Sequence, residues 1–234
     1  TGAVDKALGG LITQLIEDGE IKGSAGETTL IHTLGKIKPS RVLVAGLGPQ
    51  DKFDAQVVRR VSAEVVRFLR RKGISSAATI AHGTGIDGLD PQLSGQAIAE
   101  GAHLGLYKFG VYLTKSGEST NEFEKLTVME LDKDRAKSIE VGVKLGCTIA
   151  RASITARNMV NEPANHMTPS RMAEAAQKVA TNQGLRIEIM DNAQIKKMGM
   201  GAFMGVAQGT DEPAKLIVLR YDGDPSNPDN NLGL

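Results

Sequence analysis

The side chains that could bind a metal or act as a nucleophile are few in this sequence and lie far apart. The single cysteine, Cys147, lies on the apolar face of a predicted helix with no histidine beside it in the sequence, so we expect it to pack as a small apolar side chain. The four histidines fall in four separate predicted elements, and no two show the i, i+4 spacing of zinc ligands on one helix face. They are His32, His82, His103 and His166. The residues by themselves predict no catalytic, cofactor-binding or metal-binding site.

Two glycine-containing segments follow predicted strands and are possible phosphate-binding loops. In residues 44–49 (VAGLGP) the glycines would let the backbone approach a phosphate at the start of a helix. However, Asp51 stands at the third glycine position of a dinucleotide loop, and Pro49 has no amide hydrogen to donate. Residues 81–85 (AHGTG) have no Lys or Arg beside them. Both segments are therefore predicted to be tight turns.

The densest group of carboxylates is residues 222–229 (DGDPSNPD). It has a faint likeness to a calcium-binding loop, but it lacks the glycine at the sixth position and the acidic residue at the twelfth. Two prolines also stiffen it. The segment is predicted to be an exposed connection after a strand.

The elements that precede residue 134 alternate between helical and strand patterns. Residues 54–72 have valines and leucine at helical spacing between arginines, and residues 41–46 (RVLVAG) are nearly all apolar, as in a buried strand. This alternation predicts a layered α/β domain with a mainly parallel sheet. The other expected elements are helices over 4–16 and 95–109, the second interrupted by glycines, and strands over 28–33, 77–81 and 125–131.

Residues 134–160 contain no proline and carry one apolar stripe, so they predict a single long helix that bridges two units. The stripe consists of Ile139, Val143, Cys147, Ala150 and Ile154. A turn-rich segment follows, in which Thr168 can cap the next helix and Pro169 occupies its first position. That helix is expected to end near residue 182. Strands over 186–190 and 215–220, with a short helix over 192–197 between them, predict a second α/β unit.

The composition limits the classes of partner. The chain has 28 basic and 27 acidic residues, a net charge of +1, which gives no general attraction for nucleic acid or an anionic membrane. No apolar run approaches the roughly 20 residues that cross a bilayer, and the start lacks the pattern of a signal peptide. The single cysteine suits a reducing compartment. We therefore expect a cytoplasmic protein with no membrane partner, and any binding of nucleic acid would have to be local.

Two later passages resemble the catalytic domain of the leucyl aminopeptidase (cytosol aminopeptidase) family. Residues 157–169 (RNMVNEPANHMTP) are similar to the entry segment of that domain, and residues 198–221 (MGMGAFMGVAQGTDEPAKLIVLRY) to its next stretch. Their order and separation also fit. The amino-terminal part is similar to the family's first domain at Leu8-Gly9-Gly10, Lys22-Gly23, Gly26-Glu27 and residues 41–48. The resemblance covers almost the whole chain.

The resemblance implies a metal-dependent peptidase. In that family a macro-like α/β domain is joined by a long helix to the catalytic domain, and six subunits enclose the active sites. Two divalent cations, Mn²⁺ or Zn²⁺ among them, are held by aspartates, a glutamate and a lysine. Two close cations lower the pKa of a bridging water and stabilise the oxyanion formed on the peptide carbonyl. Peptide substrates and a homo-hexamer are the implied partners.

The resemblance also implies that the metal ligands lie beyond Leu234. We therefore expect residues 1–133 to be the macro-like domain, 134–160 the linking helix and 161–234 a truncated catalytic domain. On this segment we expect no bound metal and no activity, and the rest of the catalytic segment becomes a further partner. Two other functions stay open: a non-catalytic module binding nucleotide, ADP-ribose or DNA, and an assembly subunit.

Overall fold

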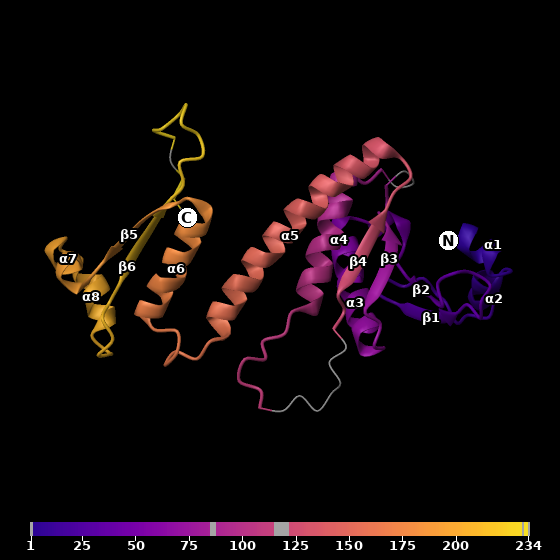
Figure 1. Ribbon diagram of the computed structural model, residues 1–234, viewed down its shortest axis with the longest axis horizontal. Coiled ribbons are helices and arrows are strands. Elements are labelled where there is room, and N and C mark those ends of the chain that lie inside the picture. The colour runs from indigo at the N-terminus through magenta and orange to yellow at the C-terminus, as the bar shows by residue number, and fades with distance from the viewer. Residues whose placement is uncertain (1, 85–87, 115–121, 231, 234) are drawn as a thin grey trace. The chain divides into compact units, whose positions relative to one another are not determined.

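The computed structural model describes residues 2–84, 88–114, 122–230 and 232–233. The chain divides into two compact units, Thr1–Arg157 and Asn158–Leu234, and each is described by itself. Both mix helices with strands, so the α/β class is confirmed (Figure 1). Among the described helices, none is both long and apolar enough to cross a membrane.

The first unit contains five α-helices, one short 3₁₀ helix and four strands among its described residues. The helices are α1 (Gly2–Ala7), α2 (Leu11–Glu17), η1 (Gln50–Lys52), α3 (Ala55–Arg71), α4 (Pro91–Leu106) and α5 (Lys133–Asn161, which extends four residues into the second unit). The strands are β1 (Thr28–His32), β2 (Arg41–Ala45), β3 (Ser76–Ile80) and β4 (Lys125–Met129).

The single helix expected over residues 4–16 is wrong, because the segment forms two helices. Gly9 and Gly10 have positive φ angles of 75° and 82°, which end α1 and set the start of α2. The Asp5 carboxylate then accepts a hydrogen bond from the Ile12 N–H at 2.7 Å and one from the Thr13 hydroxyl at 2.6 Å. Leu8, fully buried, lies in a small core with Ile12 and Ile31. The glycine pair thus divides one amphipathic segment into two short helices.

The expectation of a mainly parallel sheet is correct for only one of the two strand pairs. β3 and β4 are parallel, whereas β1 and β2 are antiparallel, with Thr28 opposite Ala45 and His32 opposite Arg41. The connection between β1 and β2 spans residues 33–40, which suits a hairpin but is too short for the crossover that parallel strands need. β3 and β4 are separated by α4, which makes such a crossover.

Helices α3 and α4 cover one face of the β3–β4 pair. Val58 and Ile98 pack against Leu126 and Val128, while Val66 lies in a second cluster with Leu126. The expected interruption of this helix by glycines is wrong, because α4 is continuous over Pro91–Leu106. Its glycines are contact points instead. A Cβ atom on Gly101 would lie 2.1 Å from the Arg59 carbonyl oxygen of α3, and one on Gly105 would lie 2.7 Å from the Ala63 Cα.

The long helix predicted over residues 134–160 is confirmed as α5. It lies along α4, and here too glycine sets the distance (Figure 1). A Cβ on Gly142 would lie 1.8 Å from the Gln92 carbonyl oxygen, and one on Gly146 would lie 2.4 Å from that of Gln96. The buried residues of α5 are Ile139, Gly142, Gly146 and Ala150. The small residues, more than the larger members of the predicted stripe, form its contact with α4.

The second unit places a helix against an antiparallel strand pair. Its elements are α6 (Pro169–Gln183), β5 (Arg186–Met190), α7 (Asn192–Lys197), α8 (Gly201–Ala207) and β6 (Leu216–Arg220). The predicted start of α6 is confirmed: Thr168 accepts a hydrogen bond from the Arg171 N–H, and Pro169 is the first helical residue. Helix α8 was missed, because its sequence reads as a glycine-rich turn. The register pairs Ile187 with Leu219 and Ile189 with Ile217.

Candidate functional site

The glycine loop at residues 44–49 is filled by the chain itself. A Cβ on Gly46 would lie 2.2 Å from the Ser24 carbonyl oxygen, and the Gly48 N–H donates to the Gly23 carbonyl at 2.9 Å. Gly48 also has a positive φ of 79°. These contacts explain the glycines without a phosphate and confirm the interpretation as a turn that needs glycine geometry.

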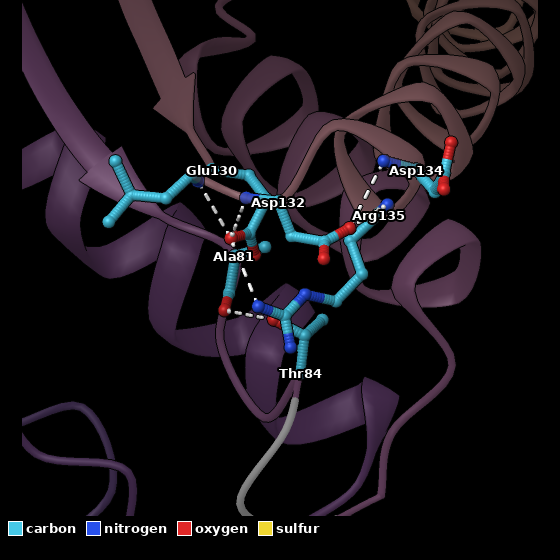
Figure 2. Close-up of polar contacts among 7 residues, drawn as sticks. Ala81, Thr84, Glu130, Asp132, Asp134 and Arg135 are labelled. Atoms are coloured by element: carbon cyan, nitrogen blue, oxygen red, sulfur yellow. Dashed lines mark hydrogen bonds and ion pairs between the residues drawn. The ribbon is translucent and has the colours of Figure 1, made fainter.

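The carboxyl ends of the parallel strands β3 and β4 are the place where a ligand would be expected in an α/β fold. Figure 2 shows the side chains at this edge. The Glu130 carboxylate accepts hydrogen bonds from the backbone N–H groups of Leu131 at 2.7 Å and Asp132 at 3.0 Å, and the Arg135 guanidinium lies 3.4 Å away. On the β3 side, the Thr84 hydroxyl donates to the Ala81 carbonyl at 3.1 Å. Together these residues form the strand-end cluster.

The strand-end cluster is acidic and satisfies itself. The Asp132 carboxylate caps α5 by accepting from the N–H groups of Arg135 at 2.8 Å and Asp134 at 3.0 Å. The hydrogen bond from the Asp132 N–H is the largest cause that lowers the pKa of Glu130. The hydrogen bond from the Arg135 N–H lowers the pKa of Asp132 in the same way. Both carboxylates are therefore held ionised. Arg135 is already paired, so the electrostatics of this edge oppose a phosphate.

His82 lies partly buried in the turn after β3. The His82 ring nitrogen Nε2 lies 3.2 Å from the Thr79 hydroxyl, and the Ser94 hydroxyl donates to the His82 carbonyl at 2.8 Å. Gly83 has a φ of 80°, and a Cβ there would lie 2.4 Å from the Phe53 ring. Gly85, the last residue of the predicted anion loop, lies outside the described residues. The described part of this segment is a packed turn.

Burial lowers the pKa of His82 below its ordinary value of 6.5. As the pH falls below about 6.5, the unfolded chain binds a proton that the folded chain does not. We therefore expect the urea midpoint of unfolding to fall from pH 7.5 to pH 5.5. The His82→Asn variant should show a smaller fall, and His32→Asn, at an exposed site on β1, should behave as the wild type. An equal pH dependence in His82→Asn would contradict this assignment.

The tertiary structure brings Cys147 to a histidine that is remote in sequence. The Cys147 sulfur lies 3.4 Å from His103 Nε2, across the contact between α5 and α4. Partial burial, and secondarily the charge of Arg151, lower the pKa of His103. A neutral imidazole does not stabilise a thiolate as an imidazolium would. Because the two residues are 44 positions apart in the sequence, there was no local signal for this pair.

Two of the three carboxylates in the acidic segment 222–229 bond to the chain itself. Asp222 forms two hydrogen bonds with the Arg186 guanidinium, at 2.8 and 2.6 Å. The Asp224 carboxylate accepts from the Ser226 N–H at 3.2 Å and the Asn227 side-chain amide at 2.7 Å. These bonds fit the predicted exposed connection.

The residues that carry the family resemblance form turns and caps, the end of α5, helix α8 and strand β6. After α5 ends at Asn161, the His166 and Met167 N–H groups donate to the Pro163 carbonyl at 2.8 and 2.9 Å. This compact turn leads directly to Thr168, which caps α6. In the second passage, Gly199 has a φ of 72° between α7 and α8. Asn231 and Leu234, at the end of the chain, lie outside the described residues.

The second unit has an open groove of about 570 Å³ between α6 and the strand pair. Its lining residues are Ser170, Ala173, Glu174, Gln177, Lys178, Ile189 and Lys215. Glu174 is ion-paired with Arg171 at 3.0 Å. Within the part of the chain that the structure describes, no group of three or more His, Cys, Asp or Glu side chains could hold a metal ion. The described residues therefore do not fit a two-metal centre.

Comparisons with known proteins identify the two halves of the chain. Residues 1–116 match the cytosol aminopeptidase family, N-terminal domain, and residues 154–234 match the cytosol aminopeptidase family, catalytic domain. A probable cytosol aminopeptidase of Alkaliphilus oremlandii is 38% identical over 222 residues, which are 94% of this chain and 44% of that protein. The cytosol aminopeptidase of Pseudomonas aeruginosa strain PAO1 is 32% identical over the same shares of both chains.

Solved structures show the same fold. A mutant of tomato leucine aminopeptidase superposes with a TM-score of 0.77 at 24% identity, over 93% of this chain and 42% of the other. The bottromycin maturation enzyme BotP in complex with Mn gives a TM-score of 0.75 at 24% identity, over 88% of this chain and 41% of the other. The chain spans 44% of the length of its first curated relatives. The two matches follow one another in the order of one family's domains, and this chain belongs to the cytosol aminopeptidase family.

Proposed function

We propose that this chain is part of a metal-dependent aminopeptidase that releases amino-terminal residues, leucine among them, from peptides in the cytoplasm. The observation that supports this most is the match of its two halves to the two domains of one aminopeptidase family. In this proposal residues 1–133 form the amino-terminal domain, residues 134–160 the linking helix and residues 161–234 the start of the catalytic domain. The whole protein would assemble as a homo-hexamer.

We further propose that the two divalent ions, Mn²⁺ or Zn²⁺, are bound by polypeptide that the longer relatives carry and this chain does not include. Two-metal hydrolysis needs several carboxylates around ions roughly 3.5–4 Å apart, and several of the described carboxylates are otherwise engaged. Asp132 caps a helix, Asp222 pairs with Arg186 and Glu100 pairs with Arg59. This chain would supply no metal ligand, and its role would be to build the frame on which the catalytic residues are placed.

The proposal predicts a difference between two lengths of the same protein. The 234-residue polypeptide should hold no stoichiometric zinc or manganese and should not hydrolyse leucine amide. The protein extended to the length of its relatives should gain aminopeptidase activity that depends on manganese or zinc. Elemental analysis and a leucine-amide assay on both proteins measure this, with sedimentation to test for the hexamer.

Three outcomes would overturn the proposal in different ways. Activity in the 234-residue polypeptide would place the site within this chain. Inactivity of the extended protein with each metal would favour a non-catalytic assembly subunit. Tight binding of a nucleotide or ADP-ribose by either protein would favour a binding module, which the carboxylates of the strand-end cluster and the filled glycine loop at residues 44–49 argue against.

A further inference from the structure

Helix α5 has an exposed apolar face in addition to the face that packs on α4. Val141, Leu145 and Ile149 are 53%, 41% and 39% exposed. Each follows the last by four residues, and the exposed Ala152 and Ala156 continue the same face. Such spacing is typical of a helix surface that packs against another element.

The rest of the helix surface is engaged or charged. The buried face is formed by Ile139, Gly142, Gly146 and Ala150. A third face carries ion pairs, Lys137 with Asp134 at 3.1 Å and Lys144 with Glu140 at 2.6 Å. A helix that faced water over two thirds of its surface would need only one apolar face. The second apolar face of α5 therefore needs a partner.

The comparisons favour one partner over the others. The match to the catalytic domain begins at residue 154, inside α5, and more than half the length of the curated relatives lies outside the part that this chain matches. A second copy of this chain fits less well, because a two-fold pairing centred on Leu145 would bring the Lys144 side chains of both copies to the same level. We propose that the exposed apolar face of α5, from Val141 to Ala156, is a packing surface for the cytosol aminopeptidase polypeptide that the longer relatives carry and this chain lacks. This inference rests on the proposed function only in requiring the longer protein.

The test compares one substitution in two lengths of the protein. Leu145→Asp puts a carboxylate on the exposed apolar face, and Lys144→Asp puts the same group on the charged face as a matched control. In the 234-residue chain both variants should keep the melting temperature within about 2 °C of the wild type, since surface changes have small effects. In the extended protein Leu145→Asp should lower it by roughly 5 °C or more, because the charge would be buried. Lys144→Asp should again have little effect.

The possible outcomes separate the partners. An equal, small effect of Leu145→Asp in both proteins would overturn the proposal. A concentration-dependent dimer of the short chain that Leu145→Asp abolishes would overturn it in favour of a second copy. The leucine-amide assay is independent of this readout. If the extended protein is inactive but only its Leu145→Asp variant loses stability, the packing surface stands and the proposed function fails.

Discussion

The Gly142→Ala substitution is expected to lower the free energy of unfolding by about 3 kcal/mol, the upper part of the range for overpacked cores. The added methyl would lie 1.8 Å from the Gln92 carbonyl oxygen and 2.7 Å from its carbon. Both are backbone atoms of α4, so no flexible side chain can move aside. α4 would have to shift away from α5, and its contact with α3 would suffer as well, because Gly101 and Gly105 leave no slack there.

The matched control is Gly205→Ala in α8, where an added methyl meets nothing within 4 Å. Alanine is favoured over glycine inside a helix by up to about 1 kcal/mol, so this variant should be neutral or slightly stabilised. Urea denaturation followed by circular dichroism measures both. If the two substitutions have similar effects, the α4–α5 contact is looser than the structure describes.

The Arg59→Ala substitution is expected to cost about 2–3 kcal/mol of stability. Arg59 of α3 forms an ion pair with Glu100 of α4, whose side chain is only 8% exposed. Breaking a buried pair from one side typically costs about 3–5 kcal/mol. The expected loss is smaller because the Arg59 side chain is 24% exposed and because Gln96 still donates to the Glu100 carboxylate at 2.7 Å.

Two further variants separate the buried charge from lost packing. In the Arg59→Ala background, Glu100→Gln removes the unpaired charge and should restore part of the stability. Arg171→Ala breaks the exposed pair with Glu174, whose side chains are 66% and 57% exposed, and should change stability by at most about 0.5 kcal/mol. If Glu100→Gln restored nothing, the cost of Arg59→Ala would come from packing alone.

Local features were predicted well where neighbouring residues determine them. The span of α3 follows from its apolar spacing and from Asp54, whose carboxylate accepts the Val57 N–H at 2.8 Å. The start of α6 follows from Thr168 and Pro169, and β5 was predicted to the residue. In each case a periodic pattern and its boundary signal lie within a few residues of one another, so the local sequence specifies both the type of the element and where it starts.

Predictions of helix boundaries failed where the structural role of a glycine depends on residues outside the local pattern. Glycines in α4 read as interruptions, yet Gly101 and Gly105 are where α3 approaches most closely. The helix expected over residues 4–16 was broken at Gly9 and Gly10, which take positive φ angles. Glycine favours breaks, turns and close contacts alike, and only the neighbouring element decides among them.

For the candidate site, too, local features were predictable from the sequence and contacts between distant residues were not. The sequence by itself determined the family resemblance, the Thr168 cap of α6 and the scattering of histidines, because motifs and spacing are local properties. Only the tertiary structure decided that the Glu130 and Asp132 carboxylates lie at the strand edge beside the turn after β3, and that His103 meets Cys147. Only it showed that α5 keeps a second apolar face exposed. These contacts and exposed surfaces depend on how helices and strands pack, because packing brings together residues that are far apart in the chain.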